Sequence, residues 1–193
     1  WLPLGAAAVG AAVILIVAMP RSPSPPRSPT SPDPLARGDE GAVTPPELHV
    51  FRSVSPHTTA PLASGATIGP REGLLFAYSS LDPAFTHLMV FAVDSRYGVH
   101  WYYPAYLRPG DDPPAIPIAP GRAGVELGEE IRHELPPGPM RVIALFLREP
   151  RGVLEIEELV RKKLAEPRRP LESGSPLPVL GATQASIILR VTP

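Results

Sequence analysis

The chain has 193 residues, a formal net charge of −1 and no cysteine. A charge so close to zero provides no basic field for a polyanion, so nucleic acid is not expected as a partner. The lack of cysteine excludes a disulfide framework, a cysteine nucleophile and a thiolate metal site. The sequence starts at Trp1 rather than Met, so we expect it to be a fragment or a processed form.

Residues 1–19 (WLPLGAAAVGAAVILIVAM) are an uncharged apolar run. A helix of this length, at about 1.5 Å per residue, spans roughly 28 Å, close to the hydrocarbon thickness of a bilayer. We therefore predict a single transmembrane helix that anchors the chain. A secretory signal peptide is the alternative, but its apolar core is usually shorter and ends at a small-x-small cleavage site, whereas this run closes on Ala18, Met19 and Pro20.

Residues 20–46 (PRSPSPPRSPTSPDPLARGDEGAVTPP) are a Pro-rich segment. Nine of the 29 prolines of the chain lie here, and almost no side chain is apolar enough to enter a core. This composition predicts a disordered stalk with a polyproline II bias, able to hold a domain away from a membrane. A Pro-rich ligand for an SH3-like module is the alternative use of the same residues.

Residues 47–193 are predicted to form one β-rich globular domain. The apolar run 86–93 (THLMVFAV) is typical of a strand covered on both faces, and the turn formers at 94–98 predict an antiparallel hairpin with 99–103 (VHWYY). The alternating and apolar patterns together predict strands at 47–54, 74–78, 86–93, 99–103, 124–135, 141–147 and 184–191. Residues 55–73 and 103–121 are expected to be turns and loops, with a short extended piece at 116–118.

One soluble helix is predicted over residues 153–164. Its apolar side chains fall on one face, namely Val153, Ile156, Leu159, Val160 and Leu164. Glutamates near its start and basic residues near its end agree with the helix dipole, and Pro167 closes it. Many strands with a single helix favour a mostly-β, sandwich-like antiparallel domain over a βαβ design, which needs regularly alternating helices.

Three segments between Leu74 and about Leu164 carry a family resemblance: MVFAVDSRYGVHWYYP, IRHELPPGPMRVIALF and EPRGVLEIEELVRKKL. In this order they resemble a bacterial domain-of-unknown-function family found outside the membrane in anchored, anti-sigma-factor-like regulators. The resemblance covers about half of the chain, and its motifs are structural rather than catalytic. Such proteins typically carry a small zinc-finger module before the transmembrane helix, which this sequence does not contain. The resemblance implies a sensor whose outer domain reports to a sigma factor.

Two signals oppose each other on the orientation of the anchor. Arg21, Arg27 and Arg37 follow the apolar run, and by the positive-inside rule they draw that side towards the cytoplasm. The long stalk and the family resemblance instead place the domain after Pro46 outside. We therefore predict a single-pass protein of the bacterial inner membrane with a periplasmic domain.

Aromatic residues followed by a basic one form the strongest surface candidate, because aromatic planes with polar tips recur at interfaces. Strand alternation sends Trp101 and Tyr103 to one face and Tyr102, with His100, to the other, so one set is core. The other set, with the loop from Tyr106 to Asp112, is a candidate surface. The candidate partner-binding residues are Trp101, Tyr102, Tyr103, Tyr106 and Arg108.

No catalytic residue, metal site or cofactor is expected from the sequence. The histidines show no HExxH motif and no i, i+4 pair, and the expected hairpin sets His100 opposite approximately Phe91, too far from His87 to share a metal. A calcium site that combines the acids 111–112 and 129–130 is the alternative, although their spacing follows no known calcium loop. Phosphate-binding glycine loops and a GxSxG elbow are absent.

The leading hypothesis is therefore a non-catalytic, membrane-anchored envelope protein whose domain binds or senses an unknown protein or envelope ligand. It extends to the outer part of an anti-sigma-type regulator if the resemblance holds. An envelope enzyme that uses loop carboxylates or histidines is the second hypothesis, and a purely structural tether is the third.

Overall fold

The computed structural model describes residues 44–55, 58–105, 108, 110–165, 176–177 and 179–193. These residues belong to a unit that spans Gly41–Pro193. The predicted transmembrane helix and nearly all of the predicted stalk lie outside the described residues. Within the described ranges, no helix is both long and apolar enough to cross a bilayer.

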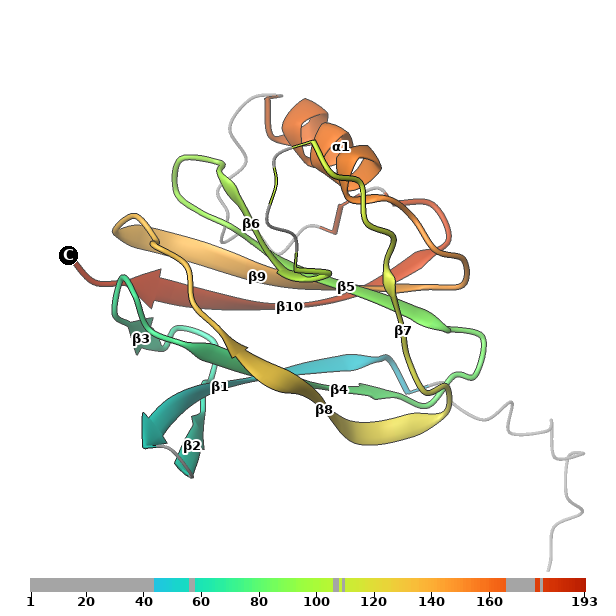
Figure 1. The fold of residues 1–193 in the computed structure, drawn as a ribbon, viewed down its shortest axis with the longest axis horizontal. Coiled ribbons are helices and arrows are strands. Elements are labelled where there is room, and N and C mark those ends of the chain that lie inside the picture. Colours follow the sequence, from blue (N-terminus) through green and yellow to red (C-terminus); the bar gives the residue numbers. More distant parts are fainter. Residues whose placement is uncertain (1–43, 56–57, 106–107, 109, 166–175, 178) are drawn as a thin grey trace, which may run out of the picture. The chain divides into compact units, whose positions relative to one another are not determined.

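The first sheet, sheet A, has four antiparallel strands in the order β2-β1-β4-β8 (Figure 1). Alternation along the first predicted strand is seen in its burial, since Val50 points inward while Phe51 is only half-buried. The strands of sheet A are β1 (Glu47–Ser55), β2 (Thr58–Pro61), β4 (Leu74–Ser80) and β8 (Arg122–Ile131).

The second sheet, sheet B, follows the order β3-β10-β9-β5-β6, with β7 paired to the start of β5. All of its pairs are antiparallel except β3 with β10. Its strands are β3 (Thr67–Ile68), β5 (His87–Val93), β6 (Val99–Tyr103), β7 (Ile116–Pro117), β9 (Gly138–Leu147) and β10 (Ala182–Val191).

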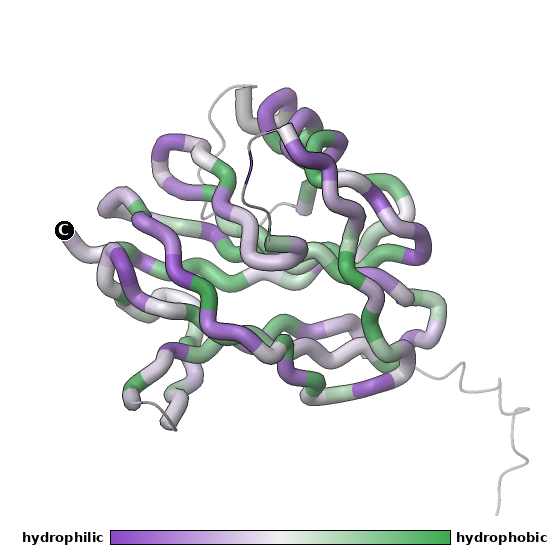
Figure 2. Tube along the Cα trace, in the orientation of Figure 1, coloured by the Kyte–Doolittle hydropathy of each residue, from purple (hydrophilic) through white to green (hydrophobic). Residues whose placement is uncertain are grey.

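The two sheets share one hydrophobic core. Sheet A contributes Val50, Phe76 and Tyr78, and sheet B contributes alternate residues of its central strands, such as Val90 and Phe146. Hydrophobic residues recur along these strands, while hydrophilic ones gather at the turns (Figure 2). Removing this apolar surface from water is the main force that holds the sheets together.

A second core lies on the other face of sheet B, under the helix α1 (Val153–Ala165). Phe91 and Ile143 of the central strands pack there with Ile156 and Val160 of α1. Because β5 and β9 are covered by sheet A on one face and by α1 on the other, their sequences are almost continuously apolar. The prediction that the run 86–93 is a strand covered on both faces is confirmed, and so is the strand predicted at 141–147.

Across the described residues, the structure confirms a mostly-β domain with mainly antiparallel pairing and one helix in its second half. The predicted hairpin of β5 and β6 is present, and the predicted terminal strand pairs with β9 along its whole length. The stretch 55–73, predicted as turn-rich, also contains the short strands β2 and β3, which were not predicted. Both strands are short and lie at the edges of their sheets. Strands this short contain too few residues to show a clear alternating pattern in the sequence.

Candidate binding site

Trp101 is part of the core beneath α1. Its ring centre lies 4.8 Å from that of Phe91, and its Nε1 donates a hydrogen bond to Glu157 Oε1 at 3.0 Å. Only 5% of the residue is exposed. A tryptophan in this position attaches the helix to sheet B and has little surface left for a partner.

An irregularity in the pairing of β5 with β6 changes the predicted alternation. Trp101 lies opposite Phe91, but the next pair is Tyr103 with Val90, so Tyr102 is an extra residue on β6. As a result Tyr102 and Tyr103 both pack on the core between the sheets. The prediction that Tyr103 shares a face with Trp101 is wrong, because a bulge shifts the side-chain alternation by one residue.

The hydroxyl groups of the two tyrosines differ in their hydrogen bonding. Tyr102 is 1% exposed, burial raises its pKa, and its hydroxyl has no hydrogen-bond partner among the described residues. Tyr103 is half-buried, and its hydroxyl donates to the carbonyl oxygens of Leu127 at 3.0 Å and Glu129 at 3.1 Å. Tyr103 therefore connects β6 of sheet B to the edge strand β8 of sheet A.

The candidate partner-binding residues thus do not form one exposed surface. Trp101 and Tyr102 lie in two different cores, and Tyr103 is turned towards β8. Arg108 is exposed, while Tyr106 lies outside the described residues. The expectation of an exposed recognition face is corrected for Trp101 and Tyr102, since both faces of this end of sheet B are covered.

The structure brings His100 to His133, a partner that the sequence did not indicate. The two ring centres are 5.7 Å apart. His100 pairs with Ala92 across the hairpin rather than with Phe91, because the tight turn at 94–98 sets the register of the first pairs. His87 instead contacts the neighbouring hydroxyl of Thr86 at 2.9 Å.

Two of the four acids of the alternative calcium site have other roles. Asp112 Oδ1 accepts a hydrogen bond from Leu154 N at 2.9 Å, which caps the start of α1. Glu130 forms an ion pair with Arg132 and lies against Gly73, where an added Cβ would overlap it. In the described part of the chain, no group of three or more His, Cys, Asp or Glu residues is positioned to hold a metal ion.

A serine and a histidine also meet on the outer face of sheet A. Ser79 Oγ lies 3.3 Å from His49 Nε2, and Glu47 Oε2 lies 3.6 Å from the same nitrogen. A catalytic relay needs the carboxylate on the opposite ring nitrogen from the nucleophile. The Ser79 hydroxyl also accepts a hydrogen bond from Gly124 N at 3.0 Å, which gives it a structural role in holding β8.

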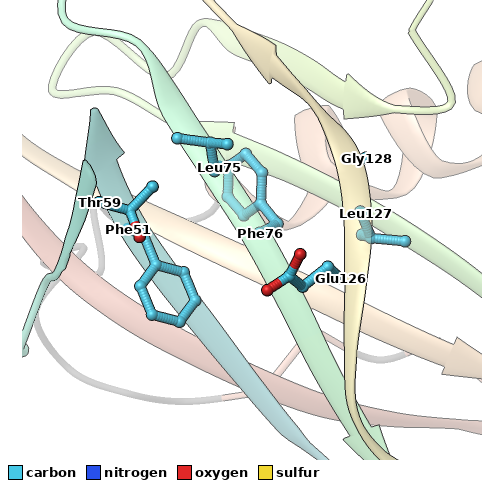
Figure 3. Close-up of a pocket in the computed structure, with 7 residues that line it drawn as sticks. All are labelled: Phe51, Thr59, Leu75, Phe76, Glu126, Leu127 and Gly128. Carbon is cyan, nitrogen blue, oxygen red and sulfur yellow. The ribbon is translucent and has the colours of Figure 1, made fainter. Parts of the chain in front are cut away.

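The same outer face carries an open groove across all four strands of sheet A (Figure 3). Phe51 of β1 pairs with Leu75 of β4, and both side chains are half-buried on the face opposite the core. Glu126 of the adjacent strand β8 provides a carboxylate at the groove. The lining residues are Phe51, Thr59, Leu75, Phe76, Glu126, Leu127 and Gly128.

The sequence carries only a weak signal for this groove. Phe51 is a large apolar residue on the strand face opposite to that of Val50. It indicates a binding surface only when the structure shows that no described element covers this face. Gly128 has no atom within 4 Å of the position of an added Cβ, which leaves the groove open beside Leu127. No family model, curated protein or solved structure matches this chain.

Proposed function

We propose that this chain is a non-catalytic, membrane-anchored envelope protein whose domain binds a partner protein through the outer face of sheet A. The observation that carries the proposal is the difference between the two outer faces. Sheet B is covered by α1, whereas no described element covers Phe51 and Leu75 on sheet A. Half-exposed large apolar side chains side by side on a sheet are typical of an interaction surface.

The chemistry of the groove suggests the kind of partner. Phe51 and Leu75 favour an apolar side chain, and the Glu126 carboxylate at the groove favours a basic group next to it. A protein segment that presents an apolar residue beside a lysine or arginine fits both. The single-pass anchor, the periplasmic location and the anti-sigma-type role remain part of the proposal and rest on the apolar run 1–19 and the family resemblance.

Site-specific photo-cross-linking in cells tests the binding surface. A photoreactive residue at Leu75 should give a cross-linked partner band, whereas one at Glu158, on the solvent side of α1, should not. Phe51→Ala and Glu126→Lys should each weaken the Leu75 band without lowering the melting temperature, because both side chains lie outside the core. Equal bands from both positions, or bands unchanged in both variants, would refute the use of this face.

Protease accessibility tests the anchor and its orientation. Protease added to intact spheroplasts should remove the domain after Pro46 while a cytoplasmic marker protein survives. Protection of the domain until the inner membrane is lysed would reverse the orientation. Recovery of the chain in the soluble fraction would contradict the anchor itself.

A further inference from the structure

His100 and His133 form a pair at the free edge of sheet B. His100 lies on β6, and His133 follows β8, so the pair is formed only when the two sheets close on each other. Their ring centres are 5.7 Å apart with an angle of 53° between the planes. The His100 side chain is 19% exposed and His133 is half-buried, so small solutes can reach them.

The hydrogen bond of His133 fixes its tautomer. Its Nε2 lies 2.8 Å from the carbonyl oxygen of Trp101, and a carbonyl can only accept. Nε2 therefore carries the hydrogen, and in the neutral ring Nδ1 keeps its lone pair. Burial, followed by the nearby His100, lowers the pKa of His133, which favours this neutral form.

The hydrogen-bond partner of His100 indicates the position of its hydrogen in the same way. His100 Nε2 lies 2.8 Å from Asp94 Oδ2, whose side chain is 6% exposed. The other oxygen, Oδ1, accepts hydrogen bonds from the backbone N–H groups of Arg96 at 2.7 Å and Gly98 at 2.9 Å, which hold the carboxylate in place. A carboxylate that accepts from Nε2–H leaves Nδ1 of the neutral His100 ring with its lone pair.

Both rings thus make, through Nε2, the kind of hydrogen bond that supports a metal-binding histidine from outside the metal site. A metal-binding imidazole usually donates its other N–H to a carboxylate or to a backbone carbonyl, and this pair uses one of each. Metal–nitrogen bonds of about 2.0–2.1 Å place two imidazoles on one ion with their centres roughly 5–6.5 Å apart. The observed 5.7 Å lies within that range.

We propose that His100 and His133 bind one divalent transition-metal ion, such as Zn²⁺, through their Nδ1 atoms. Asp94 and the Trp101 carbonyl orient the rings, and water completes the coordination on the exposed side. Imidazole nitrogen suits Zn²⁺, Ni²⁺ and Cu²⁺ and disfavours Ca²⁺ and Mg²⁺. This site is separate from the groove on sheet A, so either one can exist without the other.

Zinc titration of the full chain, purified in detergent without a polyhistidine tag, tests the proposal. We expect one ion per chain and a higher melting temperature with zinc. His100→Gln and His133→Gln should each weaken zinc binding at least tenfold. His49→Gln, which changes a partly exposed histidine on sheet A, should leave it unchanged, as should Phe51→Ala in the groove. Zinc affinity that is the same in the wild type and in both pair variants would overturn the proposal.

A measurement on the unmodified chain covers the case in which a variant fails to fold. The imidazole ¹⁵N resonances should show zinc shifting Nδ1 of His100 and His133 while both Nε2–H signals persist. Magnesium, added as a control, should shift neither. Nδ1 resonances that do not move at saturating zinc would refute the site regardless of how the variants behave.

Discussion

Tyr103 Oη lies 3.0 Å from the carbonyl oxygen of Leu127, so a side chain of sheet B is hydrogen-bonded to the free edge of sheet A. The reverse contact also exists, since His133, just after β8, is hydrogen-bonded to the carbonyl of Trp101 on β6. Each edge therefore has backbone acceptors satisfied by side chains of the other sheet. Edges occupied in this way are poor templates for the addition of a foreign strand.

Replacing Tyr103 with Phe should lower the free energy of unfolding by about 1 kcal/mol, the usual net contribution of a hydrogen bond. The ring can keep its edge-on contact with Phe76, whose centre is 6.0 Å away, so the loss isolates the hydroxyl. Urea denaturation followed by circular dichroism measures the change. A variant as stable as the wild type would show that the bond to β8 contributes nothing.

Replacing Tyr102 with Phe should have the opposite or no effect. This hydroxyl is buried without a described partner, so its removal relieves a desolvation penalty of about 1–3 kcal/mol. We expect a denaturation midpoint equal to or above that of the wild type. A loss as large as that of Tyr103→Phe would indicate a hydrogen-bond partner for Tyr102.

Charges in the two cores should be strongly destabilising. Val90 lies between the sheets and Ile143 lies under α1, and both are nearly inaccessible to water. Val90→Asp and Ile143→Asp should each cost several kcal/mol, enough to unfold a marginally stable domain. Val54→Asp is the matched control, because Val54 is 62% exposed and should change stability little. Thermal melts of all three variants test the expectation.

Stability should fall as the pH drops below neutrality, and His133 should contribute to this fall. Burial and the nearby His100 lower the pKa of His133 below its ordinary value of 6.5, so the unfolded chain binds its proton first. Where the unfolded state binds more protons, stability rises with pH. The contribution of His133 is therefore fully present above about pH 6.5 and is lost as the pH falls towards the lowered pKa.

Melting temperatures measured from neutral to mildly acidic pH can test the role of His133. His133→Gln should flatten the dependence, because glutamine can still donate to the Trp101 carbonyl without titrating. An unchanged slope in His133→Gln would assign the acid sensitivity to other groups.

The central strands and the helix were predictable because burial on two faces leaves a strong local signal. The runs 86–93 and 141–147 are apolar at nearly every position, and the structure places both between two cores. The strands β2 and β3 carry no such signal. Their strand conformation depends on pairing with β1 and β10, which no local window of sequence contains.

The tyrosine contacts, the histidine pair and the groove were harder to predict, because they depend on strand register and on contacts between segments far apart in the sequence. One extra residue at Tyr102 redirects Tyr103, and period-two alternation cannot show where a bulge falls. His100 and His133 are far apart in sequence and meet because β6 and β8 lie at adjacent edges. Phe51 could not be identified as a surface residue from the sequence, because that requires knowing that α1 covers sheet B and not sheet A.

The strand β10 has a consequence for how the protein is made. It lies in the interior of sheet B, between β3 and β9, so residues synthesised far apart in time become neighbours. Until Val191 has left the ribosome, the nascent chain carries β9 with one edge open and its apolar residues only partly covered. Products that stop before Ala182 should therefore aggregate or be degraded, because the sheet can close by hydrogen bonds only after β10 has been made.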